Sequence, residues 1–287
     1  YSAGITSSAI GTGTLTLGSA AISSSANTTG GDRTLYNAVA FSSSPTTTVF
    51  GDGTYTGILN FQTGSFALGT SAARTFTINT TTNIANTITG SSSSITKGGT
   101  GTLTLSGANT YTGASTINAG KLVLSGSGTL GNNTSTLTIS SATLDVQNGA
   151  LTVGALVMNG TSPAITNSTG TSSLTISGTS TLANSVTTSG TQTYTGAVTL
   201  GANTTLTTTN SSLIFNSTIE FHQNYEITPD VLKIRCDTIE KLIKQIEQQP
   251  FQFEKDRLIR KVNRVIDYTK YGVRIAKKQY SQYAMET

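Results

Sequence analysis

Charged side chains are scarce in the first three quarters of this sequence. Positions 1–215 hold seven, and their charges sum to +1. Positions 216–287 hold 13 Lys or Arg and 10 Asp or Glu, a net charge of +3, so the pI near 9.1 comes mainly from the C-terminal part. Because no basic surface covers the molecule as a whole, nucleic acid is not a favoured partner.

Cysteine, proline and long apolar runs are also nearly missing. Cys236 is the single cysteine, which excludes an intramolecular disulfide, and Pro45 and Pro163 are the two prolines before position 216. No run of about 18 apolar residues occurs, so we expect no transmembrane helix. The sequence opens at Tyr1 without a leader pattern. We therefore expect that a leader was removed or that the chain is a fragment of a longer protein.

Residue types that usually perform catalysis or bind metals are few. His222 is the only histidine, and the stretch 1–215 contains three carboxylates, Asp32, Asp52 and Asp145. The interval from Asp32 to Asp52 matches one coil of a repetitive fold, so the two could stack on neighbouring turns, but adjacent glycines explain both equally well as turn residues. We expect no catalytic residue, no cofactor and no metal site.

What the stretch 1–215 does contain is a pattern of alternating threonine and apolar residues. Thr102-Leu103-Thr104-Leu105 and Lys121-Leu122-Val123-Leu124 are typical segments. A period of two places the apolar side chains on one face of a strand and threonine on the other. Clusters of Gly, Asn and Ser separate these segments and supply turns. The sequence therefore predicts many short strands.

Some of these segments recur almost unchanged. Gly-Thr-Gly-Thr-Leu-Thr-Leu occurs at 11–17 and 99–105, and Thr-Tyr-Thr-Gly occurs at 54–57, 110–113 and 193–196. Self-similarity of this kind indicates stacked units, each of which covers the apolar face of its neighbour. We predict that the repeats pack through the following residues: Leu103, Leu105, Tyr111, Leu122, Leu124, Tyr55 and Tyr194. The tyrosines could instead stack on carbohydrate.

The fold class that follows is mainly β. We predict a β-solenoid (β-helix) over residues 1–219, with about 20 residues per coil and roughly ten coils. A β-sandwich built from the same strands is the alternative.

Residues 97–124 add a resemblance to a known family. This segment reads KGGTGTLTLSGANTYTGASTINAGKLVL. It resembles the autotransporter-associated β-strand repeat of autotransporter passenger domains, and residues 190–206 are also similar to repeats of filamentous-haemagglutinin-like adhesins. The resemblance implies a secreted or cell-surface β-helical stalk or adhesin. Such proteins normally end in a membrane translocator, and the C-terminal part here does not resemble one.

The C-terminal part has a helical period. We predict a charged helical tail over residues 220–287, with helices at about 229–248 and 253–284. Thr228-Pro229-Asp230 is a good helix start. The expected interaction stripe consists of Leu232, Ile239, Ile243, Ile246, Leu258, Val262, Val265, Val273 and Tyr280. Whether this tail is native to the β region or fused to it stays open.

Together these features favour an extracellular structural or adhesive protein, not an enzyme. A β surface with almost no charge is poorly protected against association, so we expect self-association into a fibre, matrix or stalk, and a host-surface glycan or protein as a further partner. Two alternatives stay open at this point. One is a trimeric viral or phage fibre, and the other is a β-helical carbohydrate-active enzyme.

Overall fold

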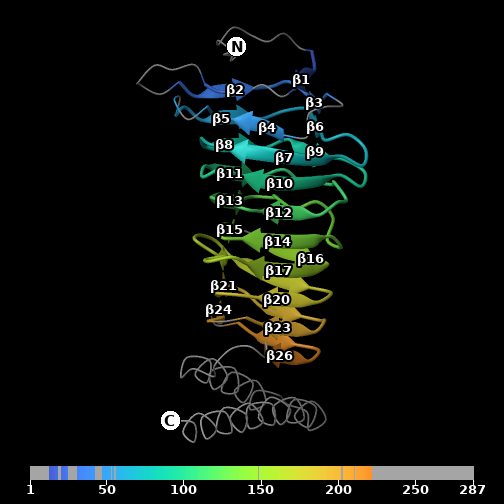
Figure 1. Cartoon of the computed structure of the whole chain (residues 1–287), viewed down its shortest axis with the longest axis vertical. Helices are drawn as coiled ribbons and strands as arrows, with labels where there is room; N and C mark the ends of the chain where they lie inside the picture. The colour runs from blue at the N-terminus through green and yellow to red at the C-terminus, as the bar shows by residue number, and fades with distance from the viewer. Residues whose placement is uncertain are drawn as a thin grey trace, which may run out of the picture.

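Short strands and tight turns follow one another along the chain (Figure 1). The computed structural model describes residues 13–18, 21–24, 31–42, 47–52, 54, 56–147, 149–201, 203–209 and 211–221. Within these residues the chain forms 26 strands, each three to six residues long. Every pairing between them is parallel.

Nine strands form the sheet that faces the viewer in Figure 1, here called the front sheet. Its strands are β4 (Thr47–Phe50), β7 (Ala73–Ile78), β10 (Ser94–Gly98), β12 (Ser115–Ile117), β14 (Thr136–Ser140), β17 (Ala155–Asn159), β20 (Ser180–Leu182), β23 (Val198–Leu200) and β26 (Ile219–Phe221).

Nine more strands form a second sheet, here called the side sheet. Its strands are β2 (Arg33–Leu35), β5 (Leu59–Phe61), β8 (Thr82–Ile84), β11 (Thr102–Leu105), β13 (Lys121–Leu124), β15 (Thr143–Val146), β18 (Ala164–Thr166), β21 (Ser185–Thr188) and β24 (Thr205–Thr208).

A third face is made of two four-stranded sheets, one near each end of the stack. The first holds β1 (Leu15–Leu17), β3 (Val39–Phe41), β6 (Ser65–Ala67) and β9 (Thr87–Thr89). The second holds β16 (Gly149–Val153), β19 (Ser172–Ile176), β22 (Gln192–Tyr194) and β25 (Leu213–Phe215). Between β9 and β16 the chain crosses this face twice without forming a strand.

The strand order shows that the chain winds as a β-solenoid of about nine turns. Successive strands belong to different faces, and each pairs with the strand one coil away. A β-sandwich needs antiparallel neighbours, so the uniformly parallel pairing excludes that alternative.

The coils differ in length. One coil step is as short as the interval from Ser180 to Val198, and another is as long as the interval from Phe50 to Ile78. Long coils near the N-terminal end use more of the chain per turn. For this reason the solenoid has about nine turns, where about 20 residues per coil predicts roughly ten.

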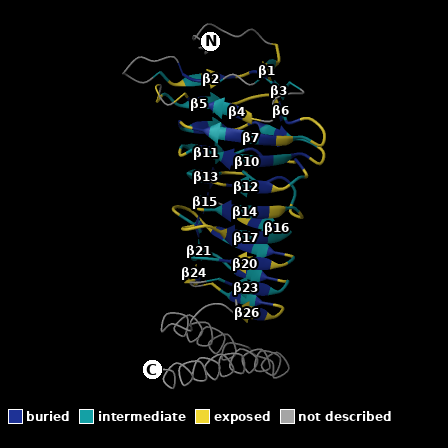
Figure 2. Ribbon diagram, viewed as in Figure 1, coloured by how far each residue is buried: buried dark blue, intermediate teal, exposed yellow. Residues whose placement is uncertain are grey.

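Apolar side chains from all three faces form the core of the solenoid. Figure 2 marks buried positions along the strands of the stack. Near the N-terminal end the filling is aromatic, with neighbouring ring centroids 5.4–5.9 Å apart among Phe41, Phe50, Phe61, Phe66 and Phe76. Below it Leu, Ile and Val predominate. Along most strands buried residues alternate with partly exposed ones, so the period-two pattern places the core as the sequence predicts.

Identical sequence segments occupy different faces of the solenoid. The heptapeptide at 99–105 contributes β11 to the side sheet, whereas its copy at 11–17 contributes β1 to the third face. The unit that recurs is therefore a strand with its turn, and a copy does not mark the start of a coil.

The last described strand, β26, ends at Phe221. The predicted boundary at residue 219 stays a prediction. The predicted helices at about 229–248 and 253–284, together with His222, lie outside the described residues. In the described part of the chain, no helix combines the length and hydropathy needed to cross a membrane.

Leu103 tests the stacking of coils. It is fully buried and lies in register with Thr82 on one side and Leu122 on the other. Leu103→Ala should lower the free energy of unfolding by about 2–4 kcal/mol, because it leaves a cavity between coils. Thr104→Val, on the outer face of the same strand, should change it by about 0.5 kcal/mol or less. Urea unfolding followed by circular dichroism measures both, and equal effects would contradict the assignment of faces.

Candidate functional site

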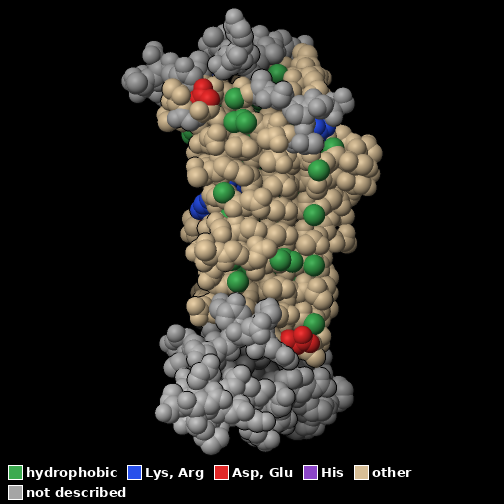
Figure 3. Space-filling model, in the orientation of Figure 1, with side chains coloured by type: hydrophobic (Ala, Val, Ile, Leu, Met, Phe, Trp, Pro, Cys, Tyr) green, Lys and Arg blue, Asp and Glu red, His purple; other side chains and the backbone are tan. Residues whose placement is uncertain are grey.

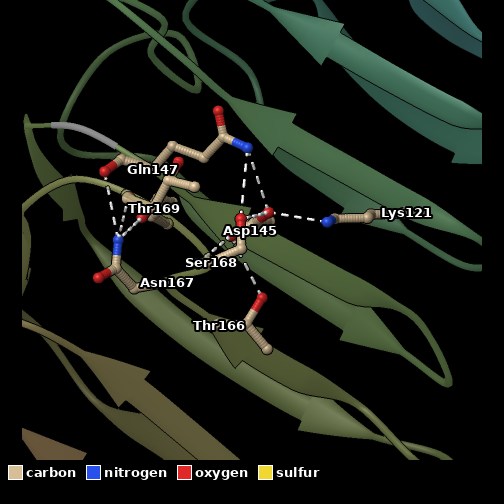
Figure 4. Close-up of polar contacts among 8 residues, drawn as sticks. Lys121, Asp145, Gln147, Thr166, Asn167, Ser168 and Thr169 are labelled. Atoms are coloured by element: carbon tan, nitrogen blue, oxygen red, sulfur yellow. Dashed lines mark hydrogen bonds and ion pairs between the residues drawn. The ribbon is translucent and has the colours of Figure 1, made fainter.

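The most elaborate polar cluster in the described residues surrounds Asp145 on the side sheet (Figure 4). Its strand neighbours Leu144 and Val146 point into the core, so the carboxylate points outward. Asp145 is nevertheless 0% exposed. The Lys121 Nζ atom lies 2.8 Å from Asp145 Oδ2, and the Lys121 side chain stays 39% exposed.

Ser168, on the coil below, completes the hydrogen bonding of this carboxylate. Its hydroxyl donates to Asp145 Oδ2 at 2.6 Å, and its backbone N–H donates to Oδ1 at 2.9 Å. Gln147 Nε2 and Thr166 Oγ1 add longer contacts of 3.4 Å. The cluster thus ties three consecutive coils together through one carboxylate, because Lys121, Asp145 and Ser168 belong to successive turns.

Burial of Asp145 acts to raise the pKa of its carboxyl group, but the hydrogen bonds from Lys121 and Ser168 outweigh it. The net effect is a pKa below the ordinary value of 3.8. A carboxylate held in this way is ionised and already occupied by donors. It can fasten a loop, but it is not poised to accept a proton from a substrate.

Lys97 is a second buried charge, at an inward position of β10 in the front sheet. Its Nζ atom donates to the carbonyl oxygens of Ala119 at 2.7 Å and Gly99 at 3.1 Å. A Cβ on Gly99, whose φ is +72°, would lie 2.3 Å from the Ile78 carbonyl oxygen, so the chain passes closely here. Burial lowers the pKa of Lys97 from 10.5 to about 8. The amine binds backbone carbonyls at a corner and is inaccessible from solvent.

Asparagines that follow strands of the side sheet bridge the coils in a similar way. Asn37 Nδ2 donates to the Gly13 carbonyl at 2.6 Å, and Asn167 Nδ2 donates to the Val146 carbonyl at 2.8 Å. Asn109 accepts a hydrogen bond from the Ile88 N–H and donates to the Thr129 carbonyl, so it connects the coil above with the coil below. It lies where the third face has no strand. Sequence reasoning treated such residues as turn formers and missed this role.

The predicted repeat-packing residues that fall in the described chain lie inside the solenoid. Leu103 is in register with Leu122, and Leu105 with Leu124, and all four are at most 2% exposed. These leucines therefore stack from coil to coil.

Tyr111 and Tyr194 are also buried, with hydroxyl groups bonded to Ser115 and Gln192 respectively. Neither ring is presented to an external sugar.

The spacing of the tyrosine motif follows the coils for only two of its copies. The interval from Tyr111 to Tyr194 equals the interval from Ser115 to Val198, and the strand register connects the latter pair in four coil steps. The copy at 54–57 precedes a strand of the side sheet, whereas the others precede the front sheet. Tyr55 itself lies outside the described residues.

Asp32 and Asp52 do not stack on neighbouring coils. Asp32 Oδ1 accepts a hydrogen bond from the backbone N–H of Ile58 at 2.9 Å. The residue beside Asp32 on the next coil is therefore Ile58. Asp52 follows the front sheet and caps a turn through the Thr54 N–H at 2.9 Å. The coils in this part of the chain are longer than the interval between the two carboxylates and bring different positions into register, so of the two readings left open by the sequence the stacking of Asp32 on Asp52 is excluded.

The tail interaction stripe, from Leu232 to Tyr280, lies outside the described residues. Among the residues that are described, no group of three or more His, Cys, Asp or Glu side chains is arranged to hold a metal ion.

The geometry defines the class of protein: a parallel β-solenoid with an apolar interior, few charges and coils joined by asparagine and ion-pair bridges. Within it, residues 95–124 match the family model of the passenger-associated transport repeat. This segment runs from β10 to β13 and includes Lys97 and Asn109. It is a β-helix repeat of the autotransporter-passenger type, as the resemblance of residues 97–124 indicates. No match was found among curated proteins or solved structures.

Replacement of Asp145 tests the polar cluster. Asp145→Asn should lower the free energy of unfolding at pH 7 by about 1–2 kcal/mol, because Lys121 and Ser168 lose a charged acceptor. Since the folded-state pKa is lowered, the stabilisation is complete above about pH 4 and is lost as pH falls through the folded pKa. Urea midpoints between pH 7 and pH 3 should therefore fall more steeply for the wild type than for Asp145→Asn. The exposed Asp32 provides the control variant, Asp32→Asn, and parallel curves for wild type and Asp145→Asn would refute the assignment.

Lys97 predicts a pH effect of the same direction in a more alkaline range. Its pKa is about 8 when folded and 10.5 when unfolded, so between these values the unfolded chain binds more protons and stability rises with pH. Lys97→Met should remove this rise. The difference in urea midpoint between wild type and variant, measured from pH 7.5 to 9.5, isolates the effect. Above pH 10 the buried tyrosines, whose pKa values are raised, act in the other direction. A constant difference across the window would show that Lys97 does not titrate as described.

Proposed function

We propose that this chain is a secreted or outer-surface structural protein, in which a β-solenoid serves as an adhesive stalk. The observation that carries the proposal is the pair of uninterrupted nine-stranded parallel sheets. At a strand spacing of about 4.8 Å they form a shaft about 40 Å high. The passenger-type repeat within the shaft implies a location outside the cell.

The distribution of polar groups supports a structural role. Asp145 and Lys97, two buried charges, bridge coils: Asp145 is occupied by Lys121 and Ser168, and Lys97 by backbone carbonyls. These contacts stabilise the winding of the chain. The outer surface is covered mainly by threonine, serine and asparagine, which can form hydrogen bonds with many partners and repel few of them.

The two alternative functions have less support. A carbohydrate-active enzyme usually needs a pair of carboxylates flanking a sugar, and Asp32, Asp52 and Asp145 occupy separate places in the fold. A trimeric fibre in which three chains wrap around one axis has strands that pair between chains. In the described shaft, each sheet is paired within one chain.

Adhesion is tested with the full chain coupled to fluorescent beads. Folded chain should retain beads on epithelial cells or on an extracellular matrix layer at least fivefold above uncoated beads, because many copies act together. Beads carrying the Leu103→Ala chain, assayed at a urea concentration that unfolds only this variant, should lose retention. Retention equal to that of uncoated beads on every surface would overturn the adhesive role.

A further inference from the structure

One row of outward side chains on the front sheet is unusually uniform. The strand register connects nine residues, one per strand, here called the threonine ladder: Thr47, Thr75, Thr96, Thr116, Thr138, Val157, Thr181, Thr199 and Glu220. All nine are exposed or half-buried, and the neighbours in sequence whose burial is described are buried. Seven are threonines, and Glu220 at the C-terminal end is the one charged member.

A second row runs beside the ladder, two positions earlier on each coil. Its members, here called the small-residue row, are Ala73, Ser94, Ala114, Thr136, Ala155, Thr179, Ala197 and Thr218. None is longer than threonine. Figure 3, which views this side of the molecule, shows charged side chains only at its margins. The ladder and the small-residue row together form a strip of short side chains whose one charged member is Glu220 at its C-terminal end, here called the threonine face.

The other long sheet does not offer such a face. At the level of β13 and β15 its outer row holds Val123 and Asp145, which are buried under neighbouring side chains, and Lys121 projects beside them. A row of short side chains with a single charge at one end is therefore a property of the front sheet and not of the solenoid in general.

We propose that the threonine face is the surface through which two copies of this chain associate side by side. Its side chains recur every ~4.8 Å along the stack. A second solenoid has the same repeat, so two threonine faces stay in step over their whole length. Short side chains also lose little rotamer freedom on contact, and the eight ladder positions other than Glu220 carry no charge that would repel a second face.

Glu220 determines the direction of the pair. If both copies pointed the same way, Glu220 would face Glu220 across the contact, and like charges at close range are unfavourable. In the antiparallel arrangement Glu220 faces Thr47. A twofold axis then passes through Thr138, the fifth of the nine ladder residues. Thr138 therefore faces Thr138 of the second copy, and Thr96 faces Thr181. This is an isologous contact, the commonest kind in homodimers.

The size of the face indicates how strong the contact is. Nine rungs at ~4.8 Å and a width of about 15 Å cover about 600 Å² per copy, or about 1,200 Å² in total, the lower limit of specific interfaces. The pair should therefore be weak between isolated molecules and become effective where many copies stand together. The expectation that many copies stand together rests on the proposed stalk function, whereas the contact itself can be measured on the purified chain.

Cross-linking tests the register. In a Cys236→Ser background, Thr138→Cys should form at least tenfold more covalent dimer under mild oxidation than Thr175→Cys, its counterpart on the third face. The Thr96→Cys and Thr181→Cys chains should cross-link when mixed and much less when oxidised separately. Equal cross-linking of Thr138→Cys and Thr175→Cys, or none at Thr138, would overturn the proposal. Efficient cross-linking of Thr96→Cys with itself would overturn the antiparallel direction.

A charge placed at the centre of the face tests the energetics. Thr138→Lys sets like charges opposite each other, so the dimer dissociation constant measured by sedimentation should rise at least tenfold. Thr175→Lys should leave it unchanged, and urea midpoints would show that both variants fold. If the full chain stays monomeric up to millimolar concentration, the proposal fails.

The bead assay separates this failure from failure of the adhesive function. Loss of cell adhesion by Thr138→Lys in a chain that never dimerises would assign the threonine face to another partner and overturn self-association. Dimerisation without adhesion to any surface would overturn the adhesive role alone.

Discussion

The structure depends on the burial of each coil's apolar side chains against those of the next coil. Leu103, Leu122 and Leu144 lie in register on successive turns and are almost completely buried. A single coil has no other means of covering them, so stability is a property of the stack. The hydrogen-bonded ladders of the three faces hold the coils at a uniform spacing, and this spacing allows inward side chains to meet and outward side chains to form rows.

Polar bridges between coils supplement the apolar interior. Asn109, Lys97 and Asp145 each bind groups on neighbouring coils. Asn109 does so where the third face has no strand, Lys97 near the end of β10, and Asp145 from within β15 of the side sheet. A chain with no disulfide among the described residues thus gains links between coils from asparagine, lysine and aspartate. The cost of burying two charges is offset by full sets of hydrogen bonds at Asp145 and by three carbonyl contacts at Lys97.

The period-two pattern was sufficient to predict the strands and the inward position of Leu103 or Leu122, because alternation is a local property. It could not assign strands to faces, since the same heptapeptide forms β1 on the third face and β11 on the side sheet. The length of each coil depends on loops whose conformation no local pattern specifies, so it varies from one turn to the next. For the same reason, sequence alone could not predict two features that depend on which coils are in register. These are the ion pair between Lys121 and Asp145 and the threonine ladder from Thr75 to Thr199.

In the solenoid, residues far apart in sequence lie in one row along the axis of the stack, and a fixed number of coil spacings separates them. Thr34 on β2 and Thr207 on β24 are both exposed or half-buried and lie at opposite ends of the side sheet. Electron paramagnetic resonance measures the distance between spin labels at these two positions directly, in labelled chain diluted with unlabelled protein. Eight strand spacings predict one narrow distribution centred near ~38 Å. A broad distribution, or a centre below ~25 Å, would contradict the solenoid.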